Sequence, residues 1–314
     1  MKYKNLGRSG LKVSELSLGS WITFGNALNA QAVRSCMHRA FELGVNYFDN
    51  AEVYAKGEAE VLMGEALKSF RREDLVISTK IFWGGNGPND TGLSWKHLVE
   101  GTRNSLRRMK LSYIDLLFCH RPDPSTPIEE TVRAMDYMIK AGYIFYWGTS
   151  EWPAAQISAA YETAARLNCI PPTAEQPQYN MLVRDRVEKE YAPIIKTYGM
   201  GLTTWSPLAS GVLSGKYNDG IPKGSRLDRN EWLRQELTPS NISRARKLGE
   251  IANSLDCSLA QLAIAWCLKN SDVSTVLTGA STVQQIEENM RAVDVKDRIT
   301  DSVRKDIDKI LQHG

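Results

Sequence analysis

A tyrosine, an aspartate, a lysine and a histidine can together deliver a proton to a substrate oxygen, and the sequence offers such a set in Tyr54, Asp49, Lys80 and His120. A phenol has a pKa near ~10 and is by itself a poor acid–base catalyst at neutral pH. The ammonium of Lys80 would lower that pKa, and Asp49 would keep Lys80 charged and fixed. His120 would hydrogen-bond a carbonyl oxygen or share the proton with Tyr54. Hydride attack on a carbonyl needs such a donor, because negative charge develops on the oxygen.

Each of these residues also has a plain structural explanation when it is taken alone. Asp49 can cap a turn, and Tyr54 can be a half-exposed packing residue. Lys80 can be a solvated charge at a strand end, and His120 can be an ordinary loop residue. Trp205, a candidate for stacking on a flat ligand, can simply belong to the core. It is their joint placement at the ends of predicted strands that favours a catalytic interpretation.

Eight short apolar runs predict eight β-strands. Runs that are apolar on both faces are typical of parallel strands covered by helices. The runs are LSLG near Leu16, VNYFD ending at Asp49, LVIST ending near Lys80, YIDLLF ending at Phe118, IFYWGTS ending at Ser150, TAEQ ending at Gln176, LTTWS ending at Ser206 and STVLTG ending at Gly279.

Segments with a 3.6-residue apolar period lie between these runs and predict helices. They cover residues 30–43, 94–109, 127–140, 153–167, 185–198, 240–255 and 258–270. Eight strand–helix units predict an α/β fold of the (β/α)₈ TIM-barrel type, formed by one domain over residues 1–314. A doubly wound sheet is the alternative, but no GxGxxG motif follows the first strand.

Two segments depart from this alternation. Residues 3–13 contain GRSG between short polar and apolar stretches, which predicts a β-hairpin before the barrel. Residues 211–239 are rich in glycine, proline and charge and predict a long loop after the seventh strand, of the kind that usually has a function. In TIM barrels the chemistry takes place at the carboxyl ends of the strands, where all four candidate residues are expected.

The bulk composition narrows the class of protein. The formal net charge of +3 does not favour binding to nucleic acid or to a membrane surface. The N-terminus, MKYKNLGRSG, lacks the apolar stretch of a signal peptide, and no window approaches the roughly 18 uninterrupted apolar residues of a membrane-spanning helix. The five cysteines are odd in number and scattered, which indicates reduced thiols, and the four histidines lack metal-ligand spacing. We therefore expect a cytoplasmic protein without a metal site and without insertion into a membrane.

Several long motifs occur in a fixed order along the chain. They include YKNLGRSGLKVSELSLGSW, VNYFDNAEVYAKGEAEVLMGEAL, YIDLLFCHRPDPSTPIEETVRAM, YWGTSEW, TAEQPQYN, WSPLASGVLSGKY and TGASTVQQIEENM. Together they resemble the aldo-keto reductase superfamily over essentially the whole chain. The wording of HRPDP, FYWGTSEW and WSPLASGVLSGKY is most similar to the branch that contains the voltage-gated potassium channel β subunits and their plant and bacterial relatives.

This resemblance implies a role for each candidate residue. Tyr54 would be the general acid, Lys80 and Asp49 would tune it, and His120 would orient the carbonyl. In channel β subunits the position of His120 is typically asparagine. The histidine resembles most reductases of the superfamily and favours genuine catalysis of aldehyde or ketone reduction.

The resemblance also implies a nicotinamide cofactor. Trp205 would stack on the nicotinamide, Ser150 and Gln176 would hold its carboxamide, and the remaining residues would line the cofactor from the active site to the adenosine. The implied cofactor-binding residues are Ser20, Trp21, Asp49, Ser150, Gln176, Trp205, Ser206, Pro207, Leu208, Gly211, Lys216, Arg226, Gly279, Ser281, Gln285, Glu288 and Asn289.

The choice of cofactor depends on the site of the 2′-phosphate. Many superfamily members place lysine and arginine there, whereas this chain has Gly279 and Gln285. Ser281 and a helix N-terminus can still bind a phosphate through backbone donors, and the channel-β branch is associated with NADP(H), so NADPH is expected.

Two other functions remain open. One is a regulatory β subunit that docks on a potassium channel and uses its bound nucleotide as a redox sensor. The other is a metal-dependent TIM-barrel hydrolase, which the scattered histidines disfavour. Whichever function applies, analogy with the channel-β branch, which includes tetramers, suggests a homo-oligomer.

Overall fold

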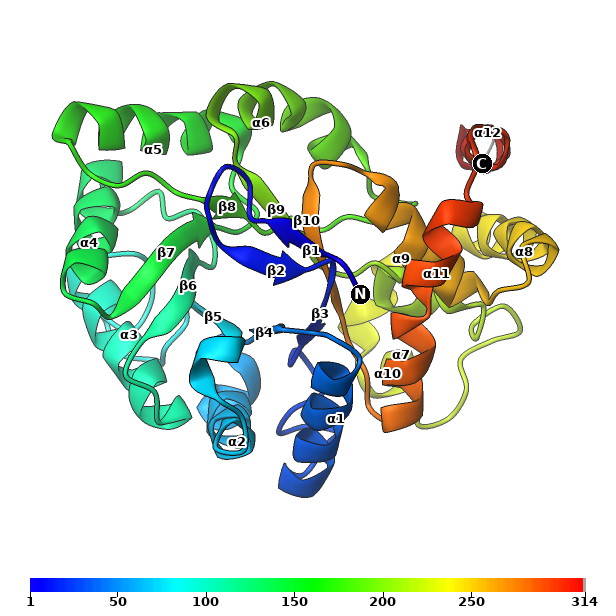
Figure 1. Ribbon diagram of the computed structural model, residues 1–314, viewed down its shortest axis with the longest axis horizontal. Helices are drawn as coiled ribbons and strands as arrows, with labels where there is room; N and C mark the ends of the chain where they lie inside the picture. The colour runs from blue at the N-terminus through cyan, green and yellow to red at the C-terminus, as the bar shows by residue number, and fades with distance from the viewer. Residues whose placement is uncertain (313–314) are drawn as a thin grey trace.

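A closed barrel of eight parallel strands forms the centre of the computed structural model, which describes residues 1–312 (Figure 1). Around the barrel the strands follow their order in the chain, and the last one pairs with the first. The predicted (β/α)₈ architecture is thus confirmed, and residues 313–314 of the expected domain lie outside the described residues. The strands are β3 (Leu16–Gly19), β4 (Tyr47–Asp49), β5 (Val76–Ile81), β6 (Ile114–Cys119), β7 (Ile144–Thr149), β8 (Ala174–Glu175), β9 (Gly201–Thr204) and β10 (Val273–Thr278).

Helices surround the barrel on its outside (Figure 1). Several begin at a residue whose side chain caps the helix, such as Ser94, whose hydroxyl accepts from the backbone of His97, or Ser258, which forms a capping box with Gln261. The helices are α1 (Ala30–Glu42), α2 (Glu58–Leu67), α3 (Trp95–Met109), α4 (Ile128–Lys140), α5 (Ala154–Leu167), α6 (Ala192–Tyr198), α7 (Arg226–Arg229), α8 (Pro239–Ser254), α9 (Leu259–Lys269), α10 (Val283–Met290), α11 (Ala292–Val295) and α12 (Asp301–Gln312).

One predicted helix, residues 185–198, is divided in the structure. A π-helical turn covers Arg186–Glu190, and α6 begins anew at Ala192. Pro193 sits in the first turn of α6, where a missing N–H is tolerated, and it could not have continued a helix from the preceding turn.

The N-terminal hairpin closes one end of the barrel. Its strands β1 (Tyr3–Asn5) and β2 (Lys12–Ser14) pair antiparallel and lie across the barrel opening in Figure 1. Leu6 and Val13 pack inside that opening against side chains from the strands, among them Tyr47, Leu116 and Phe118. Because the hairpin fills the amino-terminal end, a substrate can enter only at the carboxyl ends of the strands.

The segment that follows β9 is long, as predicted, but it is not irregular throughout. It contains 3₁₀ turns over Ala209–Ser214 and Glu231–Glu236, with α7 between them. We call residues 209–238 the strap. Its own side chains Leu213, Leu227 and Leu233 are buried, so the strap is packed onto the barrel.

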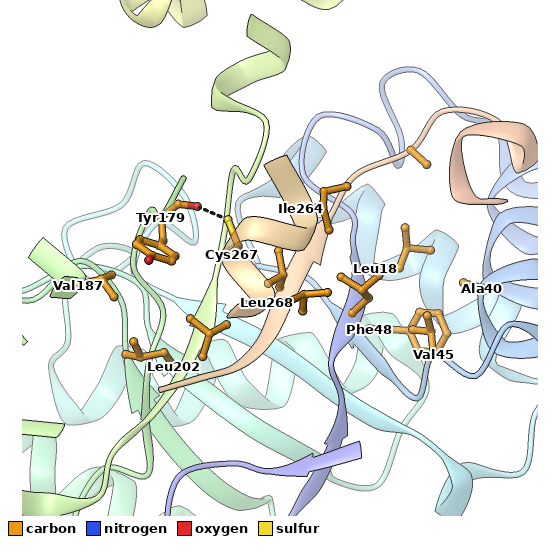
Figure 2. Packing of buried hydrophobic residues seen from close by; sticks show 14 of the residues in the cluster. Leu18, Ala40, Val45, Phe48, Tyr179, Val187, Leu202, Ile264, Cys267 and Leu268 are labelled. Carbon is orange, nitrogen blue, oxygen red and sulfur yellow. Dashed lines mark hydrogen bonds between the residues drawn. The ribbon is translucent and has the colours of Figure 1, made fainter. Parts of the chain in front are cut away.

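The main core fills the layer between strands and helices. Figure 2 shows Leu18 and Phe48 from the barrel facing Ala40 of α1, and Leu202 close to Leu268 of α9. Within residues 1–312 no single helix has the length and hydropathy of a membrane span, although α8 and α9, which meet at 87°, meet that criterion when joined.

Candidate active site

Lys80 is the centre of the polar cluster at the carboxyl ends of β4 and β5. Its Nζ lies 2.5 Å from Oδ2 of Asp49, 2.6 Å from the carbonyl oxygen of Asn50 and 3.2 Å from the hydroxyl of Tyr54. The side chain is fully buried, so its three donors are used by these three acceptors. The structure therefore brings together three of the four residues that the sequence indicated.

Asp49 is held by more than Lys80. Ser78 donates a hydrogen bond of 2.6 Å to Oδ1 of Asp49, and Nε2 of Gln176 donates one of 3.1 Å to the same oxygen. Ser78 was not among the residues predicted for the site. Its signal was present, because side chains two residues apart on a strand share a face and Ser78 precedes Lys80 by two.

Tyr54 stands at the start of a strained turn. The 3₁₀ turn Tyr54–Gly57 contains three consecutive residues with left-handed backbone, at φ 47° for Ala55, 56° for Lys56 and 90° for Gly57. Such values are unusual for residues other than glycine and cost of order ~1–3 kcal/mol each. We call Ala55–Gly57 the left-handed run. It turns the chain sharply into α2 immediately after the phenol.

Burial raises the pKa of the Tyr54 phenol above its ordinary value, and it outweighs the attraction of Lys80, which acts to lower the pKa. The effect of Lys80 was predicted from the sequence, but the larger effect of burial was not. Burial also works against the charge of Lys80, but Asp49 and Tyr54 prevail and raise the pKa of the ammonium. At neutral pH the pair is therefore a neutral phenol beside a cation, which suits a proton donor.

His120, the fourth candidate, follows β6 and faces the same space. Its ring centroid is 5.8 Å from that of Tyr54 and 5.0 Å from that of Trp83, both in edge-to-face arrangements. Burial, together with the charges of Lys80 and Arg121, holds the pKa of His120 well below its usual range. The imidazole is consequently neutral and offers one N–H and one acceptor nitrogen.

This low pKa predicts a dependence of stability on pH. Below the unfolded-state pKa of about 6.5, the unfolded chain takes up a proton that the folded His120 does not, so stability falls as the pH falls. In urea unfolding, lowering the pH from about 7.5 to about 5.5 should cost the wild type about 1.4 kcal/mol more than the His120→Asn variant. Equal losses in the two proteins would contradict a neutral, buried imidazole.

Aromatic side chains form a wall beside the polar cluster. The rings of Trp21 and Trp205 meet edge to face at 5.7 Å, and Trp232 of the strap lies 5.8 Å from Trp21. The guanidinium of Arg226 lies 5.0 Å from the ring of Trp21. The strap thus reaches the mouth of the barrel and contacts the residues expected at the nicotinamide.

The segments that follow β5 and β7 contain three further aromatic residues, Phe82, Trp83 and Trp152. Phe82 and Trp83 are partly exposed and contact each other, with ring centroids 4.8 Å apart. Trp152, by contrast, is 3% exposed and belongs to the core, so the indole itself faces away from solvent.

Several buried polar atoms near this wall lack a hydrogen-bond partner among residues 1–312. They include Oγ of Ser20, Nδ1 of His120 and Nε of Arg226. Buried polar groups normally have partners, so these atoms fit a ligand that carries hydrogen-bonding groups. Ser150 donates to the carbonyl of Gln176 at 2.9 Å and accepts from Nη1 of Arg121 at 3.5 Å, so its oxygen can accept one further hydrogen bond. The donor set is compatible with a nicotinamide and its carboxamide.

The residues expected along the pyrophosphate continue from β9 into the strap. Ser206 has a left-handed φ of 56°, and the buried residues Pro207 and Gly211 follow. Leu208 packs against the core, and Lys216 is exposed, with Nζ 4.9 Å from the ring of Tyr217.

The residues expected at the adenosine lie around the N-terminus of α10. Oε1 of Gln285 accepts hydrogen bonds from the backbone N–H and the hydroxyl of Ser281, at 2.8 and 3.0 Å. Nδ2 of Asn289 donates to the carbonyl of Gly279 at 3.3 Å, and Glu288 accepts from Gln284 at 3.1 Å. The donors of Ser281 could bind a phosphate once Gln285 moves aside.

A second buried pair lies behind Tyr54 and was not foreseen. Glu52 accepts from the backbone N–H of Phe82 at 2.7 Å and lies 3.1 Å from Nε2 of His97. It ties the loop after β4 to the loop after β5. The described residues contain no group of three or more His, Cys, Asp or Glu side chains placed to hold a metal ion.

Comparison with known proteins adds to this geometry. A family model described as "Aldo/keto reductase family" matches residues 15–312. The chain is 55% identical to a "Probable voltage-gated potassium channel subunit beta" of Arabidopsis thaliana, over 99% of this chain and 97% of that protein. A protein of the same description from Oryza sativa subsp. japonica is 52% identical over the same shares. A "Putative voltage-gated potassium channel subunit beta" of Schizosaccharomyces pombe is 48% identical, over 98% and 93%.

Proposed function

This chain belongs to the aldo/keto reductase family, and on that premise we propose that it reduces aldehydes or ketones to alcohols with NADPH. The observation that carries the proposal is the position of Lys80, whose ammonium contacts both Asp49 and the hydroxyl of Tyr54 in a buried site. A general acid needs this arrangement to donate a proton to an oxygen that becomes negative.

Tyr54 acts as the general acid. Lys80 stabilises the phenolate that remains after proton transfer, and Asp49 keeps Lys80 in place and charged. His120, neutral and edge-on to Tyr54, donates a hydrogen bond to the same carbonyl oxygen and so orients the substrate. The aromatic rings around the mouth exclude water, which strengthens each of these interactions.

When bound, NADPH supplies the hydride. Trp205 would stack on the nicotinamide, Ser150 and Gln176 would hold its carboxamide, and Ser20, Trp21 and Asp49 would line the same end. The pyrophosphate would lie under the strap and the residues before it, namely Ser206, Pro207, Leu208, Gly211, Lys216 and Arg226. The adenosine would be held by Gly279, Ser281, Gln285, Glu288 and Asn289. The unpaired buried atoms of Ser20 and Arg226 support this assignment.

The test is consumption of NADPH, followed by absorbance, with a panel of small aliphatic and aromatic aldehydes and ketones. NADH is run in parallel at the same concentrations. We expect turnover with aldehydes and a higher kcat/KM with NADPH than with NADH. Absence of turnover with every carbonyl, in a preparation that binds NADPH, would contradict the proposed activity.

A second candidate function is supported by the names of the relatives, each of which is described as a channel β subunit. On this alternative the protein docks on the cytoplasmic side of a potassium channel and its bound NADP(H) acts as a redox sensor. A pulldown with the purified cytoplasmic domain of a voltage-gated potassium channel would test it, and failure to bind would reject it. The two functions are compatible, because docking does not require the catalytic residues.

A further inference from the structure

Glu151 lies next to the candidate nicotinamide site without a role in the chemistry described so far. It follows Ser150 at the end of β7 and has a left-handed backbone, with φ of 58°. Its Oε1 accepts a hydrogen bond of 3.0 Å from the indole Nε1 of Trp205 and one of 2.6 Å from the backbone N–H of Gln178. The carboxylate is thus directed at the indole rather than at solvent, and its side chain is 17% exposed.

The other oxygen of the carboxylate faces a cation. Nη1 of Arg186 lies 2.5 Å from Oε2 of Glu151, and Arg186 also reaches Glu190, at 3.6 Å. Glu151 therefore stands between an indole and a guanidinium, and Arg186 offsets part of its charge. The contacts thus run from the guanidinium of Arg186 to the carboxylate of Glu151 and from there to the indole of Trp205.

The main chain already fixes Trp205. Its backbone N–H donates to the carbonyl of Pro177 at 3.0 Å, and its carbonyl accepts from the N–H of Tyr179 at 3.1 Å. The bond from Nε1 to Glu151 is therefore not needed to hold the backbone at the end of β9. It fixes the orientation of the indole ring and places a negative charge at the edge of that ring.

An indole whose N–H is bonded to a carboxylate carries more negative potential on its ring face, and such a face attracts cations more strongly. The nicotinamide ring is positively charged when oxidised and neutral when reduced. The charge of Glu151 should consequently stabilise the oxidised ring and leave the reduced ring almost unaffected.

We propose that Glu151, acting through Trp205, sets the relative affinity of the site for the oxidised and the reduced nicotinamide nucleotide. The proposal rests on the proposed function, because it requires that the nucleotide's ring lies against Trp205. Glu151 is a positioning and tuning residue and does not touch the reacting atoms. Arg186 moderates its effect.

The experiment measures the dissociation constants of NADP⁺ and NADPH separately, by isothermal titration calorimetry. In Glu151→Gln the amide oxygen can still accept from Trp205 and Gln178, but the charge is gone. We expect the ratio Kd(NADP⁺)/Kd(NADPH) to rise about fivefold, as a unit charge several ångströms away can produce at an intermediate dielectric. Arg186→Met leaves the carboxylate unopposed, so the ratio should fall.

Glu190→Gln is the matched control, since it alters a carboxylate that contacts Arg186 but not Trp205, and its ratio should stay unchanged. Equal weakening of both nucleotides in Glu151→Gln, or a ratio that moves in the same direction in Glu151→Gln and Arg186→Met, would overturn the inference. A wild-type protein that binds neither nucleotide would instead refute the proposed function itself, and the inference with it.

Discussion

Replacing Tyr54 by phenylalanine should lower kcat/KM for aldehyde reduction by about 10²–10⁴-fold, the usual contribution of a positioned general acid. The variant lacks only the hydroxyl, which in the structure lies 3.2 Å from Nζ of Lys80. Lys80 keeps its bonds to Asp49 and to the carbonyl of Asn50, so the cluster stays in place. The dissociation constant for NADPH, measured by fluorescence, should change by less than about twofold, because the phenol is directed at the substrate oxygen.

Tyr143→Phe is a suitable control for this experiment. Its hydroxyl accepts a hydrogen bond from Arg103 on the outside of the barrel, before the start of β7, and has no contact with the cluster. Full activity is expected there. Unchanged turnover in Tyr54→Phe would remove the phenol from the mechanism, whatever the affinity for NADPH.

Replacing Lys80 by methionine should lower the free energy of unfolding by about 3–5 kcal/mol, the cost of leaving one partner of a buried ion pair without the other. The carboxylate of Asp49 would keep the donors Ser78 and Gln176 but would lose its cation inside a site without solvent. The measurement is equilibrium unfolding in urea. We propose that residues 1–314 form one domain, so that unfolding takes place in a single transition.

A double variant separates the charge of Asp49 from the packing of Lys80. Lys80→Met combined with Asp49→Asn leaves a neutral acceptor for Ser78 and should recover most of the lost stability. It should not support activity, because the cation that stabilises the phenolate is missing. Lys96→Met, which breaks an exposed pair with Glu100, should change stability little. If Lys80→Met were as stable as the wild type, the ion pair would not be desolvated as the structure has it.

Much of the architecture was accessible from the sequence because strand patterns and strand ends are local signals. The eight apolar runs correspond to the eight barrel strands, and the placement of Asp49 and Lys80 at the ends of neighbouring strands predicted their proximity. Of the helices with ten or more residues, two were missed. In α2 apolar and polar residues are not separated onto two faces, and even Glu60 is buried, while α12 buries only Ile307. α2 therefore gives no clear helical period, whereas α12 does place its apolar and polar residues on opposite faces and could have been predicted.

The parts of the site that escaped prediction depend on distance in three dimensions. The net rise in the pKa of Tyr54 comes from burial, which no local pattern reports. The pair of Glu52 and His97 joins residues 45 positions apart, and the contact of Glu151 with Trp205 joins residues 54 positions apart. These contacts exist only because the barrel brings the carboxyl ends of its strands, and the segments that follow them, close together.

The left-handed run after Tyr54 has a consequence for how this protein can change over time. Ala55 and Lys56 hold a backbone conformation that glycine would adopt freely, so a glycine at either position would relieve strain but would also loosen the turn that aims the phenol. At these two positions, substitutions that raise stability would therefore lower turnover. A homologue with glycine at either position would have less backbone strain but would hold the phenol less firmly, even though every residue that touches the substrate stayed the same.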